Sequence, residues 1–437
     1  MVEWLDAEIR EQILSAHRKR RGKIEIVGKV MIKDSRDLAF YYTPGVAAVS
    51  KAISENADLS YEYTSRGNTI AIISDGTRVL GLGDLGPEAE MPILEGKTLL
   101  FKKFGGVDAI PICVGSKSED DIVKFVEMIK PSVAAINIED IEMPKAFNIT
   151  RKLEERLKLP LFHDDRSGTA IVVRAALINA LSVVGKNFRD IKVVINGAGA
   201  AGIGVAEILC ASKVRSIIVC DTAGAIYEGR QNNMNEFKEI VSKVTNAGME
   251  KGNLSEVVKG ADVLIGVSHQ HSFTKEMIKT MAKSPIIFAL ANPDPEIDYQ
   301  EAKDAGAAIV ATGRSDMPNQ VNNYMAFPGL FRGLLSSHAS KITNDMIMAA
   351  SDAIASYVKK SERSESHIIP KFGNIKEYTA LTIRIATRVA AAAVDSGAAK
   401  AHPNKNQIKN EIKMMLSMYN KIEKNIERLN QKYDAND

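Results

Sequence analysis

The chain has 437 residues, which is enough for two domains with extensions or for about three domains. Hydrophobic residues make up 45% and charged residues 25%, with 30 glycines and 14 prolines, and these proportions exclude the disordered, collagen-like and low-complexity classes. The 57 basic and 54 acidic residues leave a net charge of +3, which is too small on this length for a general nucleic-acid binder.

The first residues and the cysteines indicate the compartment. Four acidic residues stand where a secretory signal would need an apolar core, namely Glu3, Asp6, Glu8 and Glu11. We find no run approaching the roughly 18 apolar residues of a membrane-spanning helix. The three cysteines lack the paired spacing of a zinc site or a disulfide framework, so we expect Cys113, Cys210 and Cys220 to be reduced, small apolar residues. We therefore expect a cytoplasmic protein without a membrane contact.

Residues 1–165 are predicted to alternate short strands with helices. Apolar, β-branched runs closed by turn signals predict strands over 69–73 and 108–113, and the glycine-rich segment 81–87 predicts a loop. By the same patterns we expect helices over 5–20, 119–129 and 150–159 and strands over 133–138 and 161–162. Two acids and then a long apolar helix over 169–184 mark the hinge to the next region.

Residues 166–335 show a regular alternation of strands and helical stretches. Strands are predicted over 192–195, 216–220, 263–267, 285–290 and 308–311, and a helix over 202–211. Strands separated by helices are typical of a parallel, doubly wound sheet. The expected fold class is α/β, with a Rossmann-type domain over 166–335 and a second α/β domain over 1–165.

Residues 336–437 are predicted to be mainly helical, with helices over 344–358 and 379–393 and a patterned tail over 404–433. Apolar residues in the tail are spaced alternately four and three apart, as in a coiled coil; they are Ile408, Ile412, Met415, Tyr419, Ile422, Ile426, Leu429 and Tyr433. Such a helix packs either against a second subunit, which we favour slightly, or against the chain's own core.

A glycine-rich turn over 196–202 predicts a dinucleotide site. It follows a strand and opens a helix, and Asp221 ends the next strand about 20 residues on, which is the arrangement of Rossmann folds. Gly197 allows the tight turn, Gly199 the approach of a pyrophosphate, and Gly202 the close packing of helix and strand. The amides of the residues between them would hold the anion; these residues are Ala198, Ala200 and Ala201. A glycine turn without a ligand is the alternative.

The residue after the second strand indicates which dinucleotide binds. Asp221 is placed to accept hydrogen bonds from ribose hydroxyls, and its charge would repel a 2′-phosphate. Residues 222–225 offer no Arg or Lys to neutralise such a phosphate. The sequence therefore favours NAD over NADP, although NADP stays possible.

Two pairs of acids follow predicted strands, Glu139 with Asp140 and Asp164 with Asp165. Carboxylates gathered at strand ends repel one another unless a cation holds them, and ligands with oxygen alone select Mg²⁺ or Mn²⁺. Solvated acids in turns are an equally good interpretation of these residues alone.

Lys97 and Tyr42 are candidates for proton transfer. A lysine partly buried near a divalent cation would have a lowered pKa and could act as a base. An exposed lysine at a helix start is the alternative. Tyr42 precedes a rigid Pro-Gly turn that could direct its phenol, and simple packing is the alternative.

Taken together, these motifs resemble the ordered series found in malic enzymes. The resemblance covers about residues 17–340 and consists of residues 42–47 (YTPGVA), 74–84 (SDGTRVLGLGD), 95–97 (EGK), 138–140 (IED), 163–165 (HDD), 168–170 (GTA), 292–295 (NPDP) and 319–323 (NQVNN). Two segments depart from the family pattern, residues 166–167 (RS) and 268–271 (SHQH). They leave the proposed catalytic groups in place and bear on the cofactor preference.

The resemblance implies an enzyme that converts malate to pyruvate and CO₂ while reducing NAD or NADP, with Mg²⁺ or Mn²⁺. It implies a metal and substrate domain over 1–165, completed by C-terminal helices that fold back on it. The resemblance also implies these residue roles: Glu139, Asp140 and Asp165 as metal ligands, Lys97 as base with Asp164 beside it, Tyr42 as acid, Arg78, Asn292 and Asn323 on the substrate, and Ser268, Asn292 and Asn323 at the cofactor. Apart from the resemblance, we expect a homo-oligomer and favour a homodimer.

Two other functions share these motifs. One is a decarboxylase that retains its cofactor, such as a malolactic or oxaloacetate-only enzyme. The other is a nucleotide-binding regulator without turnover, which would have no need of Tyr42, Lys97 and the acids.

Overall fold

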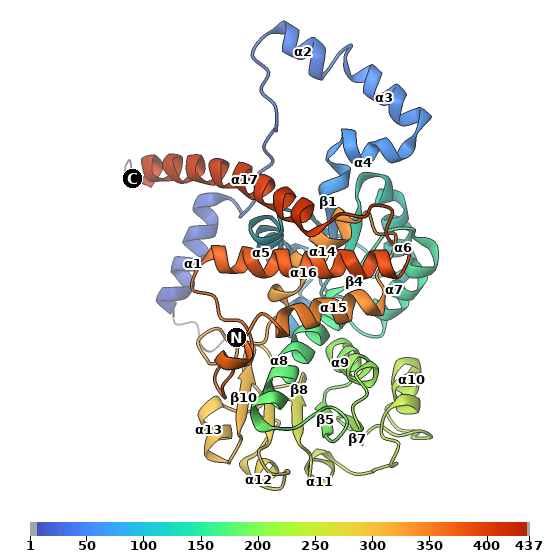
Figure 1. Cartoon of the computed structure of the whole chain (residues 1–437), viewed down its shortest axis with the longest axis vertical. Helices are drawn as coiled ribbons and strands as arrows, with labels where there is room; N and C mark the ends of the chain where they lie inside the picture. The colour runs from blue at the N-terminus through green and yellow to red at the C-terminus, as the bar shows by residue number, and fades with distance from the viewer. Residues whose placement is uncertain (1–6, 435–437) are drawn as a thin grey trace.

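The computed structural model describes residues 7–434, with the side chains of residues 426–434 left out of the description, and contains two parallel sheets that lie one above the other in Figure 1. The first sheet has the order β2-β1-β3-β4. Its strands are β1 (Thr69–Ser74), β2 (Asp108–Cys113), β3 (Ala135–Ile138) and β4 (Leu161–His163). Because all its strands run parallel, their carboxyl ends lie at one edge of the sheet.

The second sheet has the order β10-β9-β8-β5-β6-β7 and is parallel except for β7. Its strands are β5 (Lys192–Asn196), β6 (Ser216–Asp221), β7 (Gly224–Ala225), β8 (Val263–Gly266), β9 (Ile286–Ala289) and β10 (Ile309–Thr312). The strand order reverses at β5, where Rossmann-type sheets bind their ligands. The predicted α/β class with a doubly wound sheet is confirmed.

Helices cover these sheets. They include α5 (Pro87–Gly105), α6 (Glu119–Ile129), α7 (Lys145–Arg156), α8 (Thr169–Val184), α9 (Ala200–Ala211), α10 (Glu236–Val244), α11 (Leu254–Val257), α12 (Lys275–Lys279) and α13 (Tyr299–Asp304). The helix expected over 150–159 begins earlier, at Lys145, because Phe147 and Ile149 also face the core.

Helix α8 connects the two sheets and corrects one expectation. With the turn before it, Asp164–Val184, it is long and apolar enough to cross a membrane, which we did not anticipate. Most of this segment is buried against other parts of the protein, and it packs on α9. It is a core helix.

Three further helices fold back onto the first half of the chain. They are α14 (Phe327–Ser336), α15 (Asn344–Ala355) and α16 (Ile375–Asp395). Gly329 and Gly333 let α14 approach α16, since an added Cβ would lie 2.7 Å from Ile385 Cβ and 2.7 Å from the Ala386 carbonyl oxygen. Both α14 and α16 also contact α5, and α15 contacts α8.

The tail forms α17 (Lys405–Asp434), and it uses its apolar face within this chain. Ile408, Ile412 and Leu416 pack on Ala386 and Ala390 of α16. Next to Ile412 in the same helix, Glu411 pairs at 2.9 Å with Arg332, which is buried on α14. For this part of the tail the favoured docking on a second subunit is wrong, and the alternative holds. The side chains of Ile426, Leu429 and Tyr433 lie outside the described ones.

The N-terminal segment leaves the body and returns to it. It contains α1 (Ala7–Arg20), α2 (Ser35–Tyr41), α3 (Val46–Glu55) and α4 (Ser60–Tyr63). In Figure 1 the blue ribbon of α2 and α3 stands clear at the top of the molecule. We call residues 30–59 the arm.

Candidate active site

Lys97 lies at the centre of a buried group of charges at the carboxyl ends of β3 and β4. Its side chain extends from α5, and Nζ contacts the carboxylates of Glu139 and Asp164. Burial by itself would lower the pKa of Lys97, but the charges of Asp164 and Glu139 outweigh it and the pKa is raised. Without added positive charge nearby, Lys97 is therefore an ammonium ion, opposite to the direction expected for a base.

The predicted metal ligands follow the same two strands. Glu139 and Asp140 directly follow β3, and Asp165 lies just after β4. Burial, opposed by Lys97, raises the pKa of Glu139, and burial together with the charge of Asp165 raises that of Asp140 to about 7. Within residues 7–434, no three acidic, His or Cys side chains converge closely enough to hold a metal ion as they stand. Asp165 instead accepts the Asp140 amide at 3.0 Å.

One further carboxyl group faces this site and was missed from the sequence. Glu90 on α5 is fully buried, and neither of its side-chain oxygens has a hydrogen-bond partner among the described residues. Burial and the charges of Asp140 and Asp165 raise its pKa to about 9. Only its position almost two turns before Lys97 on the same helix could have indicated it.

The three residues expected to hold substrate differ in placement. The half-buried Arg78 lies near Asp140, and its positive charge acts to lower the pKa of Asp140. The Arg78 guanidinium has no hydrogen-bond or ion-pair partner among the described residues. Asn323 donates to Asp164, and Gly168 makes this approach possible, because a Cβ there would lie 2.0 Å from Asp164 Oδ1. Asn292 is exposed and contacts neither acid pair. Arg78 and Asn323 therefore join the Lys97 group, and Asn292 stands apart from it.

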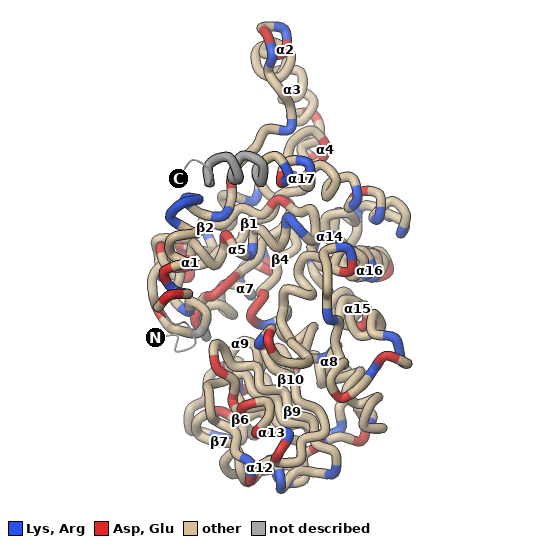
Figure 2. The backbone as a smooth tube through the Cα atoms, turned by 90° about the vertical axis from the view of Figure 1, so that its left-hand side faces the viewer, with Lys and Arg blue, Asp and Glu red and all other residues tan. Residues whose placement is uncertain are grey.

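Tyr42 is not brought to this site by its own chain. It directly follows α2 on the arm and is 65% exposed, and Figures 1 and 2 both show α2 far from α5.

A cavity of about 580 Å³ lies at the carboxyl end of the second sheet. Its lining includes Gly197, Ala198, Gly199, Asp221 and Ser268, and it also includes His269 of the segment 268–271 that departs from the family pattern. Ala200, Ala201 and Gly202 form the first turn of α9 directly behind it. The cavity is long enough along the sheet edge to reach from the glycine turn to Asp221, as a dinucleotide does.

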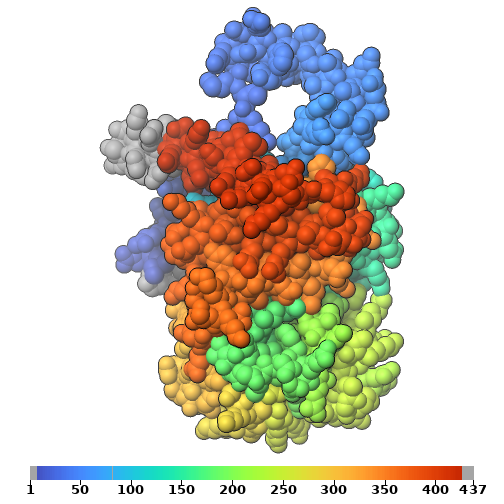
Figure 3. Space-filling view, viewed as in Figure 1, coloured from blue at the N-terminus to red at the C-terminus, as the bar shows by residue number. Residues whose placement is uncertain are grey.

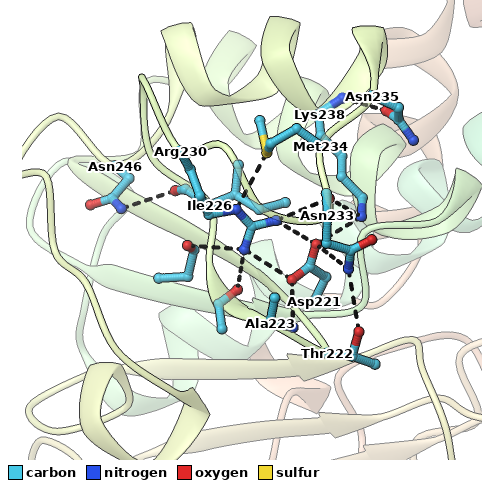
Figure 4. A network of polar contacts seen from close by, with 12 residues as sticks. Asp221, Thr222, Ala223, Ile226, Arg230, Asn233, Met234, Asn235, Lys238 and Asn246 are labelled. Carbon is cyan, nitrogen blue, oxygen red and sulfur yellow. Dashed lines mark hydrogen bonds and ion pairs between the residues drawn. The ribbon is translucent and has the colours of Figure 1, made fainter.

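Asp221 is surrounded by cations, which corrects the expectation that no Arg or Lys is near. Figure 4 shows Arg230 and Lys238 converging on its carboxylate. Arg230 binds both oxygens, at 2.9 and 2.5 Å, and Lys238 Nζ lies 2.7 Å from Oδ2. Burial by itself would raise the pKa of Asp221, but the hydrogen bonds from Arg230 and Lys238 outweigh burial and lower the pKa, so the carboxyl group is ionised. This contact could not be predicted from the sequence, because Lys238 lies 17 residues after Asp221, in α10.

The departure at residue 166 also has a structural role. Arg166 makes two hydrogen bonds to Glu207 of α9, at 2.9 and 2.7 Å, and lies over the Phe147 ring. It thus ties the end of the first sheet to the first helix of the nucleotide fold.

Comparisons with known proteins agree over nearly the whole chain. A model of the malic enzyme NAD binding domain matches residues 167–394, and a model of the malic enzyme N-terminal domain matches residues 21–154. A bifunctional malic/malolactic enzyme of Bacillus subtilis is 48% identical over 90% of this chain and 95% of its own. An NADP-dependent malic enzyme of Escherichia coli is 42% identical over 90% of this chain and 54% of its own.

Solved structures give the same answer. A malic enzyme from Pyrococcus horikoshii has a TM-score of 0.92 and 41% identity and covers 97% of this chain and 100% of its own. One from Entamoeba histolytica has a TM-score of 0.90 and 36% identity and covers 96% and 88%. This chain belongs to the malic enzyme family.

Proposed function

We propose that this malic enzyme oxidises malate at C2 with NAD or NADP and decarboxylates the product to pyruvate, with catalysis centred on Lys97. The observation that supports it is the buried contact of Lys97 with two carboxylates, beside an unpaired Arg78. An unpaired guanidinium suits a substrate carboxylate, which it can bind through two hydrogen bonds.

Within this group, Asp164 holds the proton that Lys97 must lose before its amine can act. The neutral amine then accepts the proton of the malate C2 hydroxyl while hydride leaves C2 for the nicotinamide. Carbon dioxide leaves from C4, and the hydroxyl of Tyr42 gives its proton to C3 of the resulting enolate. The roles proposed for Lys97, Asp164 and Tyr42 rest on the sequence motifs that resemble those of the family.

The carboxylates fit a hard divalent cation in their chemistry. They offer oxygen alone, Glu139 and Asp140 are buried and Asp165 is partly buried, and burial and mutual repulsion raise the pKa of Asp140 and Glu139. We propose that Glu139, Asp140 and Asp165 hold Mg²⁺ or Mn²⁺. Such an ion supplies Lewis-acid stabilisation of negative charge on the C2 oxygen.

Removal of divalent ions should abolish malate oxidation and leave cofactor binding intact. After dialysis against a chelator, the initial rate with malate should fall to background because five carboxyl groups then face a single lysine and Arg78. Added Mn²⁺ or Mg²⁺ should restore it, and NADH fluorescence titration should be unchanged throughout. Full activity in excess chelator would contradict the metal assignment.

The cofactor site supports use of both NAD and NADP. Asp221 carries one negative charge and is contacted by two cations, so the adenosine end of the cavity does not repel a 2′-phosphate as the sequence alone suggested. Lys238 also lines the cavity. Relatives named NAD-dependent and NADP-dependent are both 40% or more identical to this chain.

Lys238→Gln should lower kcat/KM for NADP about 10-fold to 100-fold and change that for NAD little, since one charged hydrogen bond is worth about 1.5–3 kcal/mol. Initial rates with malate under both cofactors measure this ratio. Lys243→Gln, at an exposed position of the same helix, is the control. An equal loss with both cofactors would show that Lys238 supports the fold and does not select the phosphate.

A malolactic activity is the second candidate, because the relative from Bacillus subtilis is named a bifunctional malic/malolactic enzyme. Product analysis separates the two activities. Pyruvate formed together with free NADH or NADPH indicates the malic reaction, and lactate formed without net reduction indicates the malolactic one.

We also propose that the protein is cytoplasmic. All three cysteines are free, with Cys220 buried and Cys113 and Cys210 partly so, which suits a reducing compartment.

A further inference from the structure

Glu90 is a buried acid that lacks a partner within the described part of the chain. It lies in the first turn of α5 and is fully buried, and neither of its carboxyl oxygens takes part in a hydrogen bond. As a carboxylate it would be an unpaired buried charge, and as an acid it would leave a donor and an acceptor unsatisfied. Both states cost free energy, which a group bound next to Glu90 would remove.

The helix that carries Glu90 is packed on several sides. Helices α14, α16 and α17 contact α5, and Figure 3 shows the orange and red residues of these C-terminal helices covering the middle of the molecule. The buried face of α5 also holds Leu94, Lys97 and Phe101, at helical spacing from Glu90. Glu90 is therefore held on the same face of α5 as Lys97.

The groups that Glu90 faces are mostly acidic. Burial and the negative charges of Asp140 and Asp165 raise the pKa of Glu90, and the charge of Lys97 opposes them. Lys97 does not neutralise Glu90, because its ammonium already contacts two other carboxylates. The space beside Glu90 therefore favours a further positive charge, and hard divalent cations bind carboxylate oxygens.

We infer that Glu90 is a fourth carboxylate at the divalent-cation site, beside Glu139, Asp140 and Asp165, and that it strengthens the binding of Mg²⁺ or Mn²⁺ before malate binds. The inference rests on the proposed function, in which the other three acids hold the ion. Those three follow β3 and β4, and Glu90 adds a carboxylate from a third element, α5. The number of charged ligands tunes the affinity of an oxygen site for a hard cation.

A calorimetric titration with Mn²⁺ alone tests this inference. The enzyme is stripped with a chelator, freed of the chelator and titrated without malate or cofactor. Glu90→Gln keeps the shape of the side chain and removes its charge. It should weaken Mn²⁺ binding about 10-fold to 100-fold, the loss typical of replacing a polar group that supports a metal site. An unchanged affinity would overturn the inference.

Glu88→Gln is the matched control. Glu88 lies in the same turn of α5 but is exposed, so its replacement removes an equal charge outside the buried site. Its affinity for Mn²⁺ should stay within about twofold of the wild type, because solvent and salt screen an exposed charge. An equal loss in both variants would show an effect of net charge alone and would also overturn the inference.

Thermal melts separate ion binding from support of the fold. In excess chelator, Glu90→Gln should melt at or above the wild-type temperature, because it replaces an acid that faces other acids with an amide that can donate to them. Added Mn²⁺ should raise its melting temperature less than that of the wild type. A variant that melts well below the wild type in chelator would assign Glu90 to the fold and not to the ion.

Asp140→Asn separates this inference from the proposed function. Weaker Mn²⁺ binding in both Asp140→Asn and Glu90→Gln supports the two together. Loss of binding in Asp140→Asn alone would leave the three-ligand site in place and exclude Glu90 from it. Normal binding in both variants would contradict the metal assignment itself.

Discussion

Lys97→Ala should reduce malate oxidation by about 10²-fold to 10⁴-fold, the range lost with a general base. The substitution removes the ammonium between Glu139 and Asp164, and these buried carboxyls then take up protons, since burial already raises the pKa of both. Cofactor binding should persist because Lys97 does not line the nucleotide cavity. The measurements are the initial rate with malate and a fluorescence titration with NADH.

Lys103→Ala is the matched control on the same helix. Lys103 contacts Glu423 of α17 and lies partly exposed, outside the Lys97 group. Its replacement should leave the rate within about twofold, because surface ion pairs contribute about 0–1 kcal/mol. Near-normal turnover of Lys97→Ala would refute its assignment as the base.

Gly202→Ala should weaken cofactor binding by about 10-fold or more and lower stability. An added Cβ would lie 1.7 Å from the Gly197 carbonyl oxygen, which is backbone and cannot rotate away. The turn between β5 and α9 would have to open, and the amides that face a pyrophosphate would move with it. Calorimetric titration with NAD and a thermal melt measure the two effects.

Gly199→Ala distinguishes the turn from the ligand. A Cβ at Gly199 meets nothing within 4 Å, so the protein alone should melt as the wild type does. Its binding of NAD should still weaken, because Gly199 lines the cavity where the pyrophosphate would approach. Gly115→Ala, which also meets nothing within 4 Å and lies outside both sites, controls for the loss of a glycine. Unchanged NAD binding in Gly199→Ala would show that the phosphates lie elsewhere.

Local pattern was sufficient for much of the fold. The helix over 169–184 was predicted with the limits that the structure has, and all described strands except β7 lie within a few residues of their predicted positions. Buried parallel strands are continuous apolar runs bounded by turn residues, so they stand out in a sequence. Strand β7 and helices α10 to α13 were not predicted, since they are short and mostly polar.

Contacts between distant segments could not be predicted in the same way. Lys238 contacts Asp221 because α10 lies near the end of β6. The spacing of these residues along the chain does not indicate that the two elements are close. The same holds for the tail. A regular apolar pattern predicts that one face of the helix is buried, but it does not predict which other helix covers that face. The motif containing Tyr42 could be read from the sequence, but the position of α2 away from α5 could not, and the role of Tyr42 stays a prediction.

The two sheets share one hydrophobic core. Ile72 and Phe162 of the first sheet belong to the same buried cluster as Val193 and Phe288 of the second, with α8, α14 and α16 packed between and around them. Separating the two halves would expose apolar residues of α8 that belong to this shared cluster. Heat or denaturant should therefore unfold both halves in a single cooperative transition, and neither half produced alone should fold.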